Sequence, residues 1–222
     1  MRYINNSDRS ADWDAYITNS NPTHWTNATK TRAYIELHKH LHKQQNGLCI
    51  YCEQKIDGIV RNKETAIQPS HIDHVLPKSD ALFKAWTFEQ NNLVMSCMGF
   101  VKGKYEQDAH GRVKQVKGMT HDFCGHPKDS LMDYDLFIDP VFDKETHLYF
   151  EFDTLGNIEP SKKNPAKANY TIKLLKLDNP ELIEWRLNVY TVLAEDTELD
   201  IESHLATFPL FYSMVKHIWG IA

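Results

Sequence analysis

Four cysteines constrain the fold of this chain more than any other feature of its sequence. Cys49 and Cys52 are separated by two residues, whereas Cys97 and Cys124 stand alone and far downstream. Two cysteines at the closer spacing can present both sulfurs to one tetrahedral Zn²⁺. The bound metal then replaces hydrophobic core that a small irregular subdomain cannot supply. The sequence therefore predicts one structural zinc ion held by all four thiolates, although four unrelated buried thiols would also fit the count.

The cysteines also bear on the compartment in which the chain works. An even number of cysteines can form disulfides in a secreted protein, but no apolar run that resembles a signal peptide follows Met1. No apolar stretch is long enough to span a membrane, so we expect no membrane partner. We expect a cytoplasmic protein of 222 residues, 41% of them hydrophobic, with a core in one domain or in a small module with a helical companion.

The net charge of −5 is unusual for a protein that approaches a polyanion unaided, since Lys and Arg supply most non-specific affinity for nucleic acid. The distribution of charge is more informative than the sum. Residues 98–121 hold five basic and two acidic side chains, whereas residues 178–222 hold two basic and eight acidic ones. Solvated charged faces explain each bias equally well, so the charges only support a nucleic-acid partner.

Hydrophobic periodicity and turn residues predict an α+β chain. Residues 27–46 are expected to form a helix with Asn27 as its cap and Gly47 after its end, and its apolar stripe contains Tyr34, Leu37, His38 and Leu41. Extended segments are expected over residues 66–76, where Pro77 ends the strand, over residues 91–97, and over residues 147–153, with a return strand from Ile158 after a Gly156-Asn157 turn. Helices follow, one starting at Pro180 and the last, residues 201–218, interrupted by Pro209. The first 26 residues show no clear period.

Several histidines are candidates for chemistry. His38 and His42 are four residues apart and could bind a metal from one helix face, but the interleaved Lys39 and Lys43 favour an exposed basic surface. His71 precedes Asp73 and His74, and in a regular strand it would share a face with Asp73 while His74 points to the other. For His71 we favour a core or hydrogen-bonding role over a metal role.

Several motifs resemble those of the HNH, or ββα-metal, endonuclease family. They are Cys49-x-x-Cys52, Asp73-His74-x-x-Pro77, Asn92-Leu93 with Cys97, and Cys124-x-His126-x-Lys128. The chain is more closely similar to the Septu- and retron-associated, PtuB-like HNH nucleases of antiphage defence. That likeness rests on His71-Ile72-Asp73-His74 with Pro77-Lys78-Ser79, the run from Asn92 to Cys97, Phe137-Ile138-Asp139-Pro140, Gly156-Asn157-Ile158 and the run from Thr171 to Leu177.

The resemblance implies a zinc-stabilised ββα module over residues 47–135, between an N-terminal segment and helix (1–46) and a hairpin with a helical C-terminal region (136–222). It implies a metal-dependent endonuclease with His74 as general base and Asn92 as the amide that holds the loop carrying this base. Asp73 and His126 are the expected ligands of a catalytic Mg²⁺ or Mn²⁺, with His121 the rival of His126.

The chemistry of phosphodiester hydrolysis fits these residue types. It requires a base to deprotonate water and a cation to stabilise the charge on the phosphorane and on the departing oxygen. An imidazole titrates near neutrality, and a carboxylate is a hard ligand for Mg²⁺ or Mn²⁺.

The partners follow from the same resemblance. The expected substrate is DNA, with RNA left open, and an SMC- or ABC-like ATPase would present it. A different class of protein also fits the sequence, namely a docking subunit that keeps the zinc module but has a degenerate nuclease site.

Overall fold

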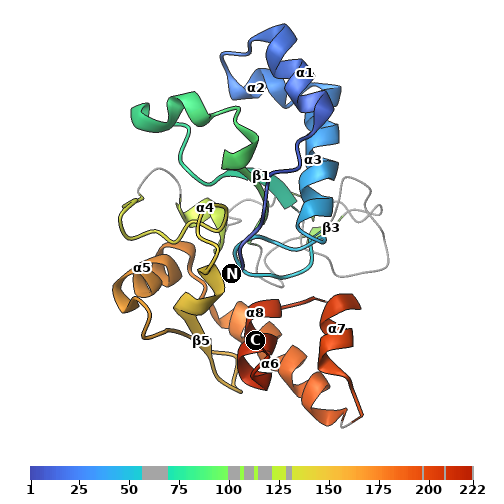
Figure 1. The fold of residues 1–222 in the computed structure, drawn as a ribbon, viewed down its shortest axis with the longest axis vertical. Helices are drawn as coiled ribbons and strands as arrows, with labels where there is room; N and C mark the ends of the chain where they lie inside the picture. Colours follow the sequence, from blue (N-terminus) through green and yellow to red (C-terminus); the bar gives the residue numbers. More distant parts are fainter. Residues whose placement is uncertain are drawn as a thin grey trace.

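The computed structural model describes residues 1–56, 70–99, 106–107, 113–114, 122–128, 132–196, 198–207 and 209–221. Within these ranges the chain combines helices with three antiparallel two-stranded sheets, β1-β2, β3-β4 and β5-β6, which agrees with the predicted α+β class (Figure 1). The short pair β3 (Glu106–Gln107) and β4 (Val113–Lys114) lies between the third and fourth cysteines. Most of the basic segment 98–121, including His121, lies outside the described residues.

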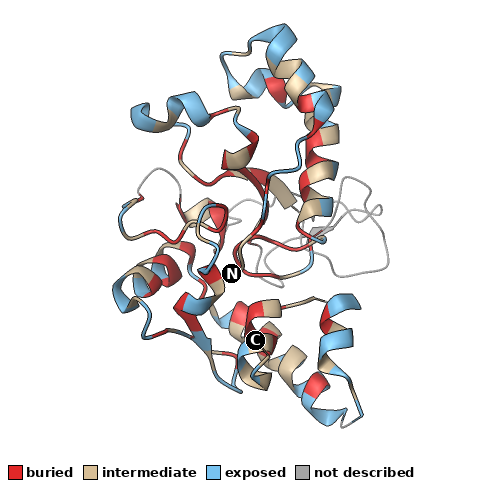
Figure 2. Ribbon diagram, in the orientation of Figure 1, coloured by how far each residue is buried: buried red, intermediate tan, exposed pale blue. Residues whose placement is uncertain are grey.

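The N-terminal region contains helices α1 (Ala11–Ser20), α2 (Trp25–Ala28) and α3 (Arg32–Gln44). The predicted start of the long helix at Asn27 is wrong. Asn27 belongs to α2, and the side chain of Thr31 caps α3 by accepting a hydrogen bond from the Tyr34 backbone N–H at 3.2 Å. The expected stripe is present, because Leu37, His38 and Leu41 are buried (Figure 2).

The expected exposed basic surface on this helix is wrong for His38. Its side chain is buried, with 7% of its surface exposed, because it lies on the same stripe as Leu37 and Leu41. His42 is half-buried, and its Nε2 lies 3.2 Å from the carbonyl oxygen of Ile56. The two histidines therefore belong to the inner side of α3.

The centre of the molecule is the hairpin formed by β1 (Ser70–His74) and β2 (Leu93–Cys97). Its register pairs Asp73 with Val94 and His74 with Leu93. Every residue of β2 is buried, as expected for a strand covered on both faces. The Gln45 side chain, at the end of α3, accepts from the Met95 backbone N–H at 2.7 Å and donates to the Met95 carbonyl at 2.9 Å. The helix end is thereby fixed to the hairpin.

Two predicted strands are shorter in the structure. Of the expected segment 66–76, residues 66–69 lie outside the described ranges, and β1 ends at His74 rather than at Pro77. Of the expected segment 147–153, the 3₁₀ turn η3 (Thr146–Tyr149) takes the first part, because the Leu148 N–H bonds back to the Glu145 carbonyl at 2.8 Å. The strand β5 is therefore Phe150–Phe152.

The C-terminal half agrees more closely with the prediction. β5 pairs with β6 (Ile158–Pro160) across the Gly156 turn, where φ is +85°. Helices α5 (Pro165–Leu175), α6 (Pro180–Glu195), α7 (Ile201–Thr207) and α8 (Tyr212–Trp219) follow, with Pro180 in the first turn of α6 and Pro209 between α7 and α8. No helix in the described part of the chain is both long and apolar enough to cross a membrane.

The last helix is fixed to the cysteine segment. The Glu53 carboxylate accepts hydrogen bonds from the Ser213 hydroxyl at 2.6 Å and from the Ser213 backbone N–H at 2.8 Å. Among the described residues after Asp178, Val192 is the only large hydrophobic side chain classed as exposed. The apolar faces of the C-terminal helices are thus used largely within the chain itself, in a cluster built around Leu193, Leu205 and Met214.

Candidate active site and metal centre

The four cysteines form one cluster, as predicted. All four are free and buried, and their sulfur atoms all lie within 4.8 Å of one another. The Cys49 and Cys124 sulfurs are 3.7 Å apart, and those of Cys52 and Cys97 are 3.8 Å apart. A tetrahedral Zn²⁺ with Zn–S bonds of about 2.3 Å separates its sulfurs by about 3.8 Å. The cluster therefore has the dimensions of a structural zinc site.

The pKa shifts of the cysteine thiols also favour a bound cation. Burial raises the pKa of the Cys97 and Cys124 thiols well above the ordinary value. At Cys49, burial acts in the same direction, but hydrogen bonds from Cys124, Cys52 and Cys97 outweigh it and the pKa falls well below that of an ordinary thiol. A divalent cation bound among the sulfurs would supply the positive charge that favours their thiolate forms.

Asp73 lies next to this cluster, and its carboxylate is held by residues from two cysteine-bearing segments. Its Oδ2 accepts a hydrogen bond from the Tyr51 hydroxyl at 2.7 Å and lies 3.4 Å from the Lys128 ammonium. Burial acts to raise the Asp73 pKa, but the positive charge of Lys128, with help from His71 and Tyr51, gives a net pKa below the ordinary value. Asp73 is therefore a carboxylate at neutral pH.

Gly125 makes room for this carboxylate. A Cβ at position 125 would lie 2.7 Å from Asp73 Oδ2, closer than real Cβ contacts, and 3.1 Å from Ser96 Oγ, which is tighter than most of them. Position 125 directly follows the last cysteine, where many members of the resembled family place a metal ligand. In this chain the space is filled by Asp73, and the histidine stands one residue later, at position 126.

His71 and His126 face each other beside Asp73, with ring centroids 4.4 Å apart. Both line a cavity of about 310 Å³ together with Asp73, His74, Lys78 and Lys128. His71 is half-buried and lines this cavity, so it is not a fully buried core residue; a hydrogen-bonding role stays a prediction. His126 lines the same cavity, and its role as a metal ligand also stays a prediction, while its rival His121 lies outside the described residues.

His74 follows Asp73 on β1 and also lines this cavity. Its ring packs edge-to-face on Trp25 with centroids 4.4 Å apart, and its Nε2 lies 3.0 Å from the Thr87 carbonyl oxygen. Burial, followed by the charge of Lys78, lowers the His74 pKa to about 4. A carbonyl oxygen can only accept a hydrogen bond, so Nε2 carries the proton and Nδ1 is the basic nitrogen of a neutral ring.

Asn92 holds the connection between the two strands. Its Oδ1 accepts from the Leu76 backbone N–H at 2.7 Å, and its Nδ2 donates to the carbonyl oxygens of Leu76 at 3.0 Å and Trp86 at 3.1 Å. Trp86 directly precedes Thr87, the residue whose carbonyl binds His74. This fully buried amide therefore fixes both ends of the segment that orients His74.

Lys128 forms the buried side of the site. It is 2% exposed, and its ammonium donates to the His74 carbonyl at 2.5 Å and to the Val75 carbonyl at 3.1 Å while it lies beside Asp73. An ammonium group has three N–H donors, and three acceptors surround this one.

The candidate ligand atoms for a second metal ion lie farther apart than the four cysteine sulfurs. Among the described residues, the cysteine cluster is the only group of three or more His, Cys, Asp or Glu side chains with ligand atoms within 4.8 Å of one another. One carboxylate and the imidazoles of His71 and His126 nevertheless share one cavity wall, a donor set that suits Mn²⁺ better than Mg²⁺. Because Oδ2 of Asp73 is engaged by Tyr51 and Lys128, Oδ1 is the oxygen left for a cation.

Sequence reasoning did not assign Tyr51, Lys128, Thr87 or Trp25 a role in this site. Two of them could have been found from their positions, because Tyr51 stands between the first two cysteines and Lys128 stands in the Cys124-x-His126-x-Lys128 motif. Thr87 and Trp25 act through a backbone carbonyl and a ring face. Neither leaves a spacing pattern that a sequence reader could find.

Comparisons with known proteins add no assignment. No model of a protein family matches this chain, and no curated protein matches it.

Proposed function

We propose that this protein is a metal-dependent endonuclease of the HNH type, in which β1, β2 and the short helix α4 (Gly125–Lys128) form the ββα unit. The observation that carries the proposal is the state of His74. Its ring is neutral, its Nε2 proton is committed to the Thr87 carbonyl, and its Nδ1 is therefore available to take a proton from water. Asn92 supports this arrangement by holding the segment that contains Thr87.

The catalytic divalent ion would be held by Asp73 and His126, with His71 beside them. When bound, such an ion supplies positive charge to the phosphate and to the departing oxygen. Asp73 is suited to the role because it is ionised in a largely buried position, and Lys128 together with Tyr51 keeps its carboxylate in one orientation. A structural zinc ion in the cysteine cluster would fix the positions of Tyr51 and His126. Tyr51 adjoins Cys52 in sequence, and His126 lies two residues after Cys124.

We further propose a role in antiphage defence, as the nucleic-acid-cutting subunit of a Septu-like complex. The motifs support this role, and so does the net charge of −5, because an acidic nuclease gains from a partner that presents its substrate. An SMC- or ABC-like ATPase is the partner that the resemblance implies. We place the docking region for this partner on the acidic helices after Asp178, although most of their apolar surface packs within the chain.

The test of the enzyme is a cleavage assay with plasmid DNA, linear DNA and RNA in Mg²⁺ or Mn²⁺, with and without an SMC- or ABC-like ATPase from the same genome. His74→Ala removes the proposed base without touching a cysteine, so zinc content and the unfolding transition should stay as in the wild type while cleavage falls by roughly 10² or more. Asp73→Ala and His126→Ala should shift the metal concentration needed for cleavage. His217→Ala is the matched control, because His217 is exposed on α8.

Full metal-dependent cleavage by His74→Ala would place the nuclease elsewhere in the complex. The chain would then be a zinc-stabilised docking subunit. One feature favours this second function: Tyr51 and Lys128 already satisfy one oxygen of Asp73, as they would in a site that no longer binds a catalytic metal.

A further inference from the structure

A second hollow adjoins the candidate site. Its volume is about 660 Å³. One wall comes from residues 22–26, at the start of α2, and the other from Lys84 and Ala85 in the 3₁₀ helix η1 (Ala81–Trp86) with Thr87 and Phe88 after it. Lys78 lines both this hollow and the cavity that contains Asp73 and His126. The two spaces are therefore neighbours on either side of one lysine, and we call the second one the flanking groove.

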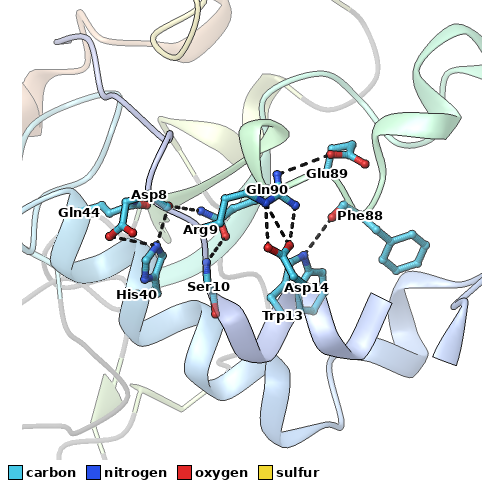
Figure 3. Close-up of polar contacts among 10 residues, drawn as sticks. All are labelled: Asp8, Arg9, Ser10, Trp13, Asp14, His40, Gln44, Phe88, Glu89 and Gln90. Carbon is cyan, nitrogen blue, oxygen red and sulfur yellow. Dashed lines mark hydrogen bonds and ion pairs between the residues drawn. The ribbon is translucent and has the colours of Figure 1, made fainter. Parts of the chain in front are cut away.

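The aromatic part of the flanking groove is rigidly supported. Trp25 and Phe88 line it, and their rings pack on each other and on the fully buried Trp13. The Trp13 Nε1 donates to the Phe88 carbonyl at 3.0 Å. Figure 3 shows this bond together with the Ser10 contact to the Gln90 side chain, which joins the N-terminal segment to the same loop. The two walls are thus fixed to each other.

The groove is positively charged although the protein is acidic. Lys78 and Lys84 line it, and no carboxylate among the described residues does so. The two acids nearest to it in sequence are engaged by other groups: Glu89, which follows Phe88, lies 3.9 Å from the Arg9 guanidinium, and Asp80 accepts hydrogen bonds from the Tyr134 hydroxyl at 2.6 Å and the Leu82 N–H at 2.9 Å. The local excess of cations in a chain of net charge −5 indicates a polyanionic ligand.

The position of Trp25 relates the groove to the chemistry. Its ring contacts His74, and Thr87, whose carbonyl holds His74, also lines the groove. Only Trp25 and Thr87 would therefore separate a ligand in the groove from His74, and hence from the phosphate on which His74 acts. Aromatic rings recessed beside lysines suit an unpaired strand, whose bases can stack on a ring while its phosphates meet the ammonium groups.

We propose that the flanking groove binds the unpaired nucleic-acid strand adjacent to the scissile phosphate, with phosphates at Lys78 and Lys84 and a base against Trp25. This inference rests on the proposed function, because it assigns the substrate path of the same site. DNA and RNA strands share the chemistry that the groove recognises, and the binding experiment distinguishes them.

The test measures binding separately from cleavage. Fluorescence anisotropy with short single-stranded DNA, single-stranded RNA and duplex DNA is recorded in the His74→Ala background, so that no probe is consumed. Lys84→Glu should weaken single-strand binding by about tenfold or more and should lower the salt dependence, since one phosphate contact is lost. Trp25→Leu should weaken it by roughly 5- to 100-fold, the range for loss of one stacked base. Lys162→Glu, an exposed lysine before α5, is the matched control and should bind as its parent does.

The outcomes separate this inference from the proposed function. If the wild type cleaves but Lys84→Glu binds single strands as tightly as Lys162→Glu does, the groove is not the strand path, although the enzyme stands. If single strands bind in a Lys84-dependent way but no substrate is cut with Mg²⁺ or Mn²⁺, the groove stands and the nuclease does not. Tighter binding of duplex than of single strands would overturn the assignment of an unpaired strand.

Discussion

Asp73 keeps its negative charge in a largely buried position because several neighbouring groups offset the effect of burial on its pKa. Its side chain is only 16% exposed, yet Lys128, His71 and Tyr51 together hold its pKa below the ordinary value. The sequence indicated that Asp73 and His71 share a strand face. It could not indicate Tyr51 and Lys128 as partners, because a hydrogen bond across 22 residues and an ion pair across 55 leave no local pattern.

Gly125 gives the most specific prediction at this scale. Gly125→Ala introduces a Cβ only 2.7 Å from Asp73 Oδ2, so the carboxylate must shift away from its contacts with Tyr51 and Lys128. We expect cleavage to fall on the order of 10²-fold, as for a catalytic group displaced by about 1 Å, while the zinc content is retained. Metal analysis and a cleavage assay on the same preparation measure both quantities.

The control for this substitution is Gly220→Ala. Gly220 has φ of +64° and no atom near its would-be Cβ, so alanine there costs backbone strain without touching the site. Cleavage should be unchanged in this variant. If Gly125→Ala also cleaves at the wild-type rate, Asp73 has no role in binding the catalytic ion in its present orientation.

Among the elements, helix α3 shows where sequence patterns are reliable and where they stop. The spacing of Leu37, His38 and Leu41 correctly predicted a buried stripe, because an apolar face at helical period needs a partner surface. The start of the helix was misplaced, since Asn27 and Thr31 are both good caps and only the chain path decides between them. Helix α1 was not predicted at all, because its support is tertiary: Trp13 is fully buried against Trp25 and Phe88.

Helix α3 also carries a buried titratable group. Burial, then the nearby His42 and His71, lower the His38 pKa to about 4, from an ordinary value of 6.5. The folded protein therefore binds fewer protons than the unfolded chain between these values. Stability from a neutral His38 is complete above about pH 6.5 and is lost as the pH falls toward 4. His74 acts in the same direction in the same window.

His38→Leu tests this account. The free energy of unfolding in urea, measured between pH 7 and 5.5, should decrease with falling pH less steeply in the variant, by up to about 1.4 kcal/mol per pH unit. His74 still titrates in the variant, so some dependence should remain. His217→Leu, at an exposed position, serves as the control. Parallel curves for His38→Leu and the wild type would mean that His38 is not buried as a neutral ring.

For the whole molecule, the cysteine cluster joins segments that are far apart in sequence. Cys49 and Cys52 follow α3, Cys97 ends β2, and Cys124 precedes α4, while α8 contacts Glu53 next to Cys52. Predicting this centre from sequence was feasible because four thiolates in one site follow from zinc chemistry alone. The packing of α8 on it was not predictable, because the Glu53–Ser213 contact spans 160 residues and involves two common residue types.

The zinc prediction is quantitative. Metal analysis of the purified chain should find about one tightly bound Zn²⁺ per molecule, and Cys49→Ser should lose it and unfold at a markedly lower urea concentration. The loss should be larger than for an ordinary core substitution, because structural zinc contributes about 10 kcal/mol or more in small domains. A zinc-free parent together with a normally stable Cys49→Ser protein would be evidence against the site.

The backbone next to Cys97 and Cys124 has a further consequence for how this chain can vary. The Asp122 N–H bonds to the Gly99 carbonyl at 3.0 Å, and a Cβ at Gly99, where φ is +65°, would lie 2.3 Å from the Phe123 carbonyl. The sequence between Gly99 and Asp122 therefore begins and ends at neighbouring points of the backbone, which this hydrogen bond and close approach hold together. Since each doubling of a loop adds only about 0.6 kcal/mol of closure entropy, its length can change with little effect on the cysteine cluster. We therefore expect the cysteine cluster to tolerate insertions and deletions in the sequence between Gly99 and Asp122.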